Sequence, residues 1–278
     1  MITRELLRQA TAELTTAGCD SPRLDAECLL AHAWSNNRAG LIARATDEVP
    51  EAITRDFFAL IERRVRREPL AYLTGEKEFW SRSFSVDPSV LIPRPETEHL
   101  IEACLATFPD RQIPLAICDI GTGSGCIAVT LACEYPDARV VATDISAAAL
   151  ETAQANATRH GVADRITFRL GSLLDALQQG DGPFELIVSN PPYVAAGEME
   201  GLAPELAFEP RTALTDESDG LQLLREILER GLKHLKPDGR IIVETGSCGL
   251  PEAPAGLLEE SRIRDLAGHL RAGVYRHL

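Results

Sequence analysis

The spacing of apolar residues predicts helices in the first part of the chain. Up to about residue 73, apolar positions recur with the period of an amphipathic helix. The segment 21–34 begins with Ser21, a typical N-cap residue, followed by Pro22 at the first helical position. A further amphipathic segment covers residues 51–68. Residues 1–73 are therefore predicted to form a small helical domain.

The pattern changes at residues 74–92, where aromatic and β-branched residues alternate with polar ones. This alternation predicts a β-hairpin that links two domains. In residues 93–278, apolar strand-like runs alternate with helical stretches, and the last helix is expected over residues 219–239, with Pro237 and Gly239 as its stop. The five strand candidates are residues 115–121, 138–145, 166–172, 184–190 and 240–245.

Alternating strands and helices are typical of an α/β domain with a doubly wound, mostly parallel sheet. Ligands of such sheets bind beyond the carboxyl ends of the strands. Functional residues are therefore expected at the ends of the predicted strands.

Composition restricts the classes of partner. The chain has 278 residues and a net charge of −14, whereas proteins that bind nucleic acid non-specifically normally present a basic surface. One basic run, RRVRRE at 63–68, is interpreted first as a solvated helix face. A direct nucleic-acid substrate is thus disfavoured.

The cysteines indicate a reducing compartment. They contain neither a CxxC pair nor a Cys/His spacing that would predict a metal site. Their odd number and scatter fit the cytoplasm better than a disulfide framework. Neither a signal peptide nor an apolar run of membrane-spanning length is recognisable in the sequence. The seven cysteines stand at positions 19, 28, 104, 118, 126, 133 and 248.

A glycine-rich turn follows the first predicted strand of the sheet. In DIGTGSGCIAV (119–129), Gly121, Gly123 and Gly125 permit a sharp turn and a close approach to a ligand. Asp144 ends the next strand, where a carboxylate can accept hydrogen bonds from ribose hydroxyls. A tight strand-to-helix turn without a ligand is the simpler alternative. The two features together favour a bound nucleoside.

The charge pattern decides between two nucleoside cofactors. The spacing is G-x-G-x-G, and Cys126 stands where the dinucleotide motif has its third glycine. Asp119, two positions before the first glycine, would repel a pyrophosphate but would attract a cation. S-adenosylmethionine carries a sulfonium and an ammonium group and no phosphate. The pattern therefore favours S-adenosylmethionine over NAD.

The fourth strand candidate ends in a rigid elbow, VSNPPYV (188–194). The side-chain oxygen of Asn190 and the carbonyl of Pro191 can accept the two N–H bonds of a planar amide or amine, so that the nitrogen lone pair is free to face a methyl donor. Pro192 stiffens the elbow, and the ring of Tyr193 can set the plane of the substrate group. An ordinary turn is the alternative. The mechanism requires no metal ion.

Several motifs together resemble one family. YLTGEKEFW (72–80), LIPRPETE (91–98), the glycine-rich turn, the elbow and FEPRTAL (208–214) are similar to the bacterial glutamine N5-methyltransferases of peptide-chain release factors. The resemblance implies a Rossmann-like class I methyltransferase domain, a helical domain that helps to hold the release factor, and methylation of the glutamine in its Gly-Gly-Gln motif. The run at 63–67 is a further candidate contact with the release factor.

The resemblance also implies the residues of the site. Asn190, Pro191, Pro192 and Tyr193 would be catalytic and would bind substrate together with Arg94 and Glu96. The implied cofactor-binding residues are Asp119, Gly121, Thr122, Gly123, Ser124, Gly125, Asp144, Ile145, Ser172, Leu173 and Asn190.

The sequence departs from the family at two places. Ser172 stands where an acidic residue near the adenine is expected, which leaves Leu173 as the apolar residue against the ring. After VETG (243–246), the stretch that should hold a full helix before the last strand pair is short and rich in proline and glycine. This shortened crossover is expected to weaken the last strands.

Two other functions fit part of the pattern. A methyltransferase acting on the exocyclic amines of DNA or RNA would use the same elbow, but it predicts a basic groove. A module that binds an adenosyl ligand without catalysis would not need the elbow at all.

Overall fold

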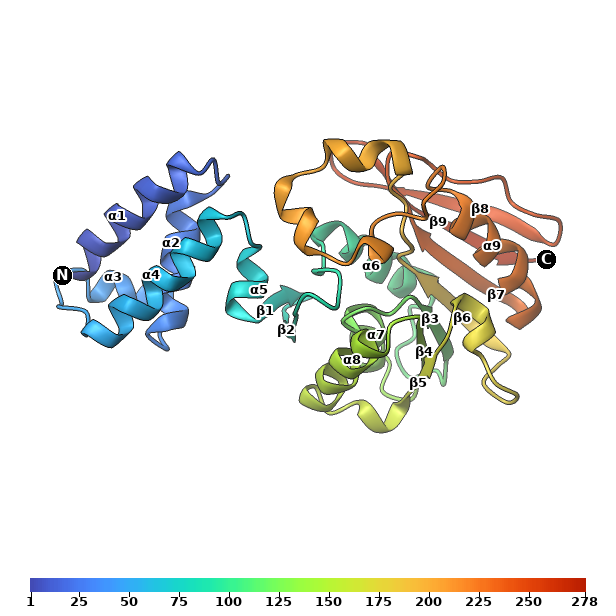
Figure 1. The fold of residues 1–278 in the computed structure, drawn as a ribbon. Helices are drawn as coiled ribbons and strands as arrows, with labels where there is room; N and C mark the ends of the chain where they lie inside the picture. Colours follow the sequence, from blue (N-terminus) through green and yellow to red (C-terminus); the bar gives the residue numbers. More distant parts are fainter. The chain divides into compact units, whose positions relative to one another are not determined.

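The protein contains two compact units, each with its own core. The computed structural model describes residues 1–278 (Figure 1). The first, here called the helical unit, consists of Met1–Glu76 together with Ala203–Phe208. The second, the sheet unit, consists of Lys77–Leu202 and Glu209–Leu278. None of the helices combines the length and apolar character required to cross a bilayer.

The helical unit packs short amphipathic helices around one apolar cluster. Leu6, Leu29, Phe57 and Ile61 are fully buried in it. The predicted helices at 21–34 and 51–68 are present, although the Ser21 side chain makes no capping hydrogen bond. The helices are α1 (Thr3–Thr16), α2 (Pro22–Ala33), α3 (Arg38–Ala43), α4 (Glu51–Val65) and α5 (Leu70–Thr74).

The interpretation of the basic run as a solvated helix face is wrong for Arg64 and Arg67, whereas Arg66 is exposed. The Arg64 side chain is only 7% exposed; its Nε lies 2.8 Å from Oδ2 of Asp25 and its Nη2 lies 3.1 Å from Oε1 of Glu205. Arg67 binds the same Glu205 at 2.7 Å. The local pattern could not show this, because the two carboxylates are distant in sequence from the arginines. Two of the arginines are therefore internal partners and are not free for an external one.

Replacing Arg64 with alanine should destabilise the helical unit. The substitution leaves Asp25 as a buried carboxylate without its partner, a change that typically costs about 3–5 kcal/mol. Trp34 lies in this unit, so its fluorescence during urea unfolding measures the effect. Arg63→Ala is the matched control, because Arg63 is 43% exposed in its pair with Glu68 and should contribute about 1 kcal/mol or less. Equal losses for both variants would contradict this account.

The sheet unit confirms the predicted doubly wound fold. A seven-stranded sheet has the order β5-β4-β3-β6-β7-β9-β8. The first five strands in this order are parallel, and β9 pairs antiparallel with both β7 and β8. A separate two-stranded hairpin, β1–β2, precedes it. The strands are β1 (Glu76–Phe79), β2 (Arg82–Ser85), β3 (Ala116–Ile120), β4 (Arg139–Asp144), β5 (Ile166–Leu170), β6 (Phe184–Ser189), β7 (Leu235–Glu244), β8 (Leu257–Arg264) and β9 (Leu270–His277).

Each face of the sheet has a separate core, because successive side chains of a strand point to opposite faces. Leu186 and Ile242 pack on one face with residues of α6 and α7, whereas Ile187 and Ile241 pack on the other with residues of α9. This two-sided burial explains why the parallel strands read as continuous apolar runs. The helices of the unit are α6 (Glu98–Thr107), α7 (Cys126–Glu134), α8 (Ala147–Arg159) and α9 (Gln222–Gly231).

Two expectations for the C-terminal part require correction or comment. The last helix ends at Gly231, a 3₁₀ turn covers Leu232–His234, and Pro237 and Gly239 lie inside β7 rather than after the helix. Proline is tolerated there because the β6–β7 pairing is interrupted at this point by a register shift. The connection from β7 to β8 contains no helix, as the short stretch suggested, yet β7 and β9 still pair over five residue pairs.

Candidate active site

A cavity of about 330 Å³ lies in the sheet unit where β3, β4 and β6 end. It lies beyond the carboxyl ends of parallel strands, which is the usual ligand position in such a sheet. The wall includes parts of the glycine-rich turn, the end of β4 and the elbow after β6. The predicted site residues that line it are Gly121, Gly123, Asp144, Ile145, Ser172, Leu173, Asn190 and Pro192.

The glycine-rich turn requires glycine for two different reasons. Gly121 and Gly123 have φ angles of +70° and +54°, and a Cβ atom at either position would enter open space. Gly125 has a φ angle of +79°, and its Cβ would lie 3.0 Å from that of Ala153. The first two glycines therefore bring bare backbone to the cavity, while the third lets α7 approach α8.

Asp144 holds this turn in place. Its Oδ2 accepts a hydrogen bond from the backbone N–H of Gly123 at 2.9 Å, and its Oδ1 accepts one from that of Ser146 at 2.8 Å. The next residue, Ile145, is 66% exposed although it is apolar. An exposed isoleucine on the cavity wall provides an apolar contact for a ring.

Asp119 is a buried carboxyl group beneath the turn. Its Oδ2 accepts hydrogen bonds from the Thr122 hydroxyl at 2.7 Å and from the backbone N–H of Ala128 at 3.2 Å. Its Oδ1 is buried without a hydrogen-bond partner. Burial raises the pKa of this carboxyl group to about 7. A nearby cation would stabilise the ionised form of this carboxyl group.

The elbow after β6 is held through two side chains. The Asn190 amide donates from Nδ2 to Oγ1 of Thr97 at 3.1 Å. The Tyr193 hydroxyl donates to Oε1 of Glu244 at 3.2 Å. The Tyr193 ring lies over Gly246, where a Cβ atom would come within 2.6 Å of it. Desolvation, followed by the charge of Glu244, raises the pKa of Tyr193, so this side chain remains a neutral donor.

The other predicted site residues do not line the cavity. The residues that do not line it include Pro191 and Tyr193 of the elbow, and Asp119, Thr122, Ser124 and Gly125 of the glycine-rich segment. Arg94 is paired with Glu209 at 2.5 Å, and Glu209 also accepts from the backbone N–H of Ile92 at 3.0 Å. Glu96 is 43% exposed and lies 3.8 Å from Arg271. Arg94 and Glu96 do not line the cavity, although both lie near enough to Tyr193 of the elbow for their charges to act on it.

Sequence reasoning did not assign several residues that the structure brings to the site. One part of the wall comes from residues just before the PRPETE segment, and another from the FEPRTAL segment and the loop that follows it. Both segments contribute to the family resemblance, but no chemistry in them pointed to a cavity. These wall residues are Ser89, Val90, Leu91, Pro210, Thr212, Ala213, Thr215, Asp216 and Glu217.

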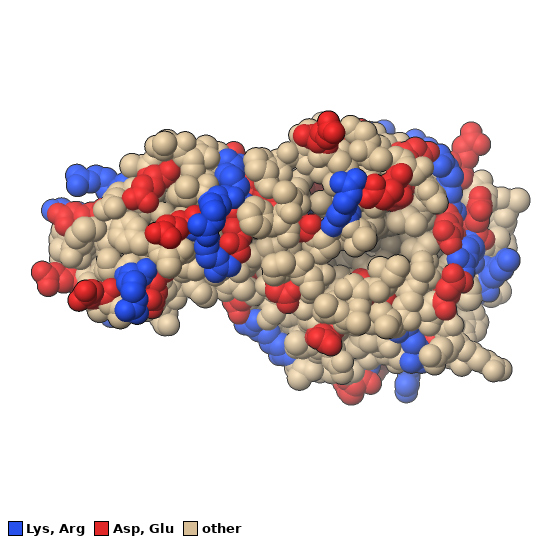
Figure 2. Space-filling view, in the orientation of Figure 1, with Lys and Arg blue, Asp and Glu red and all other residues tan.

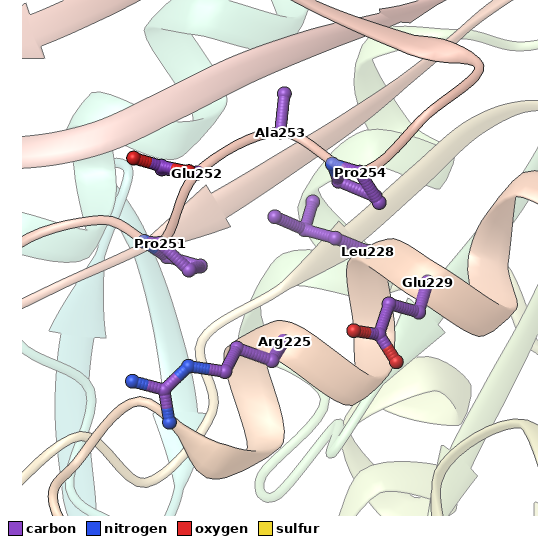
Figure 3. Close-up of a pocket in the computed structure, with 7 residues that line it drawn as sticks. All are labelled: Arg225, Leu228, Glu229, Pro251, Glu252, Ala253 and Pro254. Atoms are coloured by element: carbon purple, nitrogen blue, oxygen red, sulfur yellow. The ribbon is translucent and has the colours of Figure 1, made fainter.

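A second depression lies elsewhere on the sheet unit, between α9 and residues 251–254 (Figure 3). Arg225 and Glu229 of α9 border it together with Pro251 and Pro254. Arg225 is already paired with Asp219 at 2.8 Å. This depression contains none of the predicted site residues and offers no comparable chemistry.

Comparison with known proteins defines the class first. Residues 100–259 match the family described as the methyltransferase small domain, and residues 5–75 match the PrmC N-terminal domain. A solved methyltransferase from Pyrococcus furiosus shares the fold, with a TM-score of 0.52 and 19% identity over 78% of this chain and 98% of that one. The sheet unit is thus a methyltransferase domain.

Two relatives are similar over almost their whole length. The release factor glutamine methyltransferase of Nitratidesulfovibrio vulgaris is 46% identical, over 95% of this chain and 91% of that protein. The protein with the same name in Cereibacter sphaeroides is 43% identical, over 96% and 95% respectively. The chain belongs to the release factor glutamine methyltransferase family.

Proposed function

We propose that this enzyme transfers a methyl group from S-adenosylmethionine to the side-chain amide nitrogen of the glutamine in the Gly-Gly-Gln motif of class 1 release factors. The family membership supports this assignment. The observation that carries it is the Asn190 side chain on the cavity wall. Its nitrogen is used by Thr97, so its oxygen remains available to accept from a carboxamide.

The residues of the cavity wall and the buried Asp119 fit a cationic adenosyl cofactor. Asp119 has an unpartnered buried oxygen, which suits a positive charge better than a pyrophosphate. Gly121 and Gly123 leave room for close approach, and Asp144 together with exposed Ile145 suits a ribose and a ring. When bound, the cofactor supplies an electrophilic methyl group on a positively charged sulfur.

The elbow would activate the substrate nitrogen. A planar amide is a poor nucleophile because its lone pair is delocalised into the carbonyl. Oδ1 of Asn190 and the carbonyl of Pro191 would each accept one N–H of the amide, and the lone pair would then face the methyl donor. Pro192 fixes the backbone so that both acceptors are already oriented. The proton released from the nitrogen passes to water.

We assign recognition of the release factor to the helical domain, residues 1–73, joined by the hairpin linker of residues 74–92 to the methyltransferase domain of residues 93–278. The surface used must exclude Arg64 and Arg67, whose charges are already paired with Asp25 and Glu205. The cysteines are all free thiols, as suits an enzyme that meets release factors in the cytoplasm.

Charge supports a protein substrate rather than nucleic acid. On the face drawn in Figure 2, Lys and Arg side chains are interspersed with Asp and Glu, and the one longer run of basic side chains has acidic side chains directly beside it. The net charge of −14 acts in the same direction. The exocyclic amine of DNA or RNA is the alternative substrate that the experiment below must distinguish.

Transfer of labelled methyl groups tests the proposal directly. We expect label from S-adenosylmethionine to enter a purified class 1 release factor and to be absent from its variant in which the motif glutamine is replaced by alanine. Adenine-containing oligonucleotides serve as the competing substrate. Label on the oligonucleotides alone would refute the proposal, and label on neither substrate with intact cofactor binding would indicate a binding module.

A further inference from the structure

Glu244 is a buried carboxyl group whose role neither the fold nor the assigned site residues explain. It ends β7, and it is 1% exposed. Its Oε2 has no hydrogen-bond partner, although buried polar atoms are normally satisfied. Desolvation raises the pKa of this carboxyl group to about 7. Such a group is unfavourable for stability, so a structural role does not account for it.

The contacts of Glu244 lead to the elbow from two directions. The Tyr193 hydroxyl donates to its Oε1 at 3.2 Å, and the Thr97 hydroxyl is near enough to the same carboxyl group to lower its pKa, while Oε2 remains without a hydrogen bond. Thr97 also accepts from Nδ2 of Asn190 at 3.1 Å. Only Thr97 therefore lies between Glu244 and Asn190, the residue on the cavity wall.

The direction in which Thr97 donates its hydroxyl proton decides which way the Asn190 amide faces. A threonine hydroxyl has one proton to donate and lone pairs that accept. If a carboxylate takes that proton, the Thr97 oxygen can only accept from Asn190, so Nδ2 must point to Thr97 and Oδ1 to the cavity. If Thr97 instead donated to Asn190, the amide would turn and present N–H groups to the substrate's own N–H groups.

We propose that Glu244 is a positioning residue for methyl transfer. By accepting hydrogen bonds from the Thr97 and Tyr193 hydroxyl groups, it fixes Oδ1 of Asn190 toward the substrate amide and holds Tyr193 against the elbow. The inference rests on the proposed function, because it assigns an acceptor role to Asn190. Gly246, two residues further on, leaves the space that the Tyr193 ring occupies. The end of β7 thus supports the elbow through both residues.

Glu244→Gln tests the proposal without a change of shape. In glutamine, one of the two carboxylate oxygens is replaced by an N–H₂ group that only donates, so the hydroxyl group that faces this position loses its acceptor. An N–H₂ group that faces Thr97 would turn the Thr97 proton toward Asn190. At about pH 8 we expect kcat to fall about 10–100-fold. The dissociation constant for S-adenosylmethionine should change less than about 2-fold, and the thermal midpoint should not fall, since a buried carboxylate has been neutralised.

A second pair of variants keeps the test valid if Glu244→Gln does not fold. Thr97→Val has nearly the same volume but lacks the hydroxyl group, so it should lower kcat to a similar extent, and Thr97→Ser should restore it. In the double variant Thr97→Val/Glu244→Gln, the loss should be close to that of one single variant, because both interrupt one chain of contacts. If the losses in kcat of the two single variants multiplied in the double variant, Thr97 and Glu244 would act independently, which would contradict the proposal.

A measurement that needs no turnover separates this inference from the proposed function. The side-chain N–H₂ signals of Asn190 in a nitrogen–proton correlation spectrum are identified by their loss in Asn190→Ala. We expect them to shift in Glu244→Gln, although Glu244 does not touch Asn190. Unshifted signals together with wild-type kcat would overturn the inference. A wild-type enzyme inactive on release factors would refute the proposed function and leave the spectrum to decide on Glu244.

Discussion

Asn190→Ala should reduce kcat for release-factor methylation by about 10²–10³-fold, because the substrate amide loses one of two oriented acceptors. The change removes Oδ1 from the cavity wall and also leaves the Thr97 oxygen without its donor. The cofactor contacts proposed for the glycine-rich turn and Asp144 are not altered. We therefore expect the dissociation constant for S-adenosylmethionine to change by less than about 3-fold, a much smaller effect than that on kcat.

Single-turnover kinetics and calorimetric titration of the cofactor measure the two effects separately. Gln154→Ala is the matched control, because it removes an exposed amide side chain from α8 in the same unit and should leave both quantities unchanged. A variant of Asn190 with wild-type turnover would remove this residue from the mechanism. A loss confined to cofactor binding would assign Asn190 to the cofactor instead of the substrate.

The parts of the site that sequence could predict are those that local chemistry determines. Gly121 and Gly123 are visible because positive φ angles and close approach leave a characteristic residue type. Asp144 follows from its position at the end of a strand. Asn190 and Pro192 follow from the rare combination of an amide and two prolines after an apolar run. All of these lie on the cavity wall.

The parts that sequence could not predict depend on pairings between distant segments. Glu205 neutralises Arg64 across 141 positions, and nothing in RRVRRE indicates that partner. In the same way, Glu244 meets the elbow only because the sheet places β7 next to β6, and Thr97 meets it from the turn before α6. The sequence does not predict the early end of α9, because Pro237 and Gly239 are typical helix stops, whereas the sheet accepts them at the irregular start of β7.

Asp119→Asn should separate function from stability. The substitution keeps the shape and the oxygen that accepts from Thr122 and Ala128, but it removes the charge that would attract the cofactor. Losing one partner of a buried charge interaction typically costs 2–5 kcal/mol, so S-adenosylmethionine should bind at least about 30-fold more weakly. Calorimetric titration measures this, and Asp164→Asn, which removes an exposed carboxylate, should have no effect. An unchanged affinity would show that Asp119 does not attract the cofactor.

The same variant should be more stable than the wild type, and the difference should depend on pH. The pKa of Asp119 is raised in the folded protein from 3.8 to about 7. Between these values the folded state holds a proton that the unfolded state has released, so wild-type stability falls as pH rises toward 7 and then levels off. Asparagine has no such titration, and Glu244 contributes equally to both proteins. Urea unfolding should therefore give similar free energies at about pH 4 and a clear advantage for Asp119→Asn at about pH 8. If the advantage were absent at pH 8, the buried Asp119 carboxylate would not destabilise the wild-type protein. The view that Asp119 lowers stability in return for cofactor binding would then be wrong.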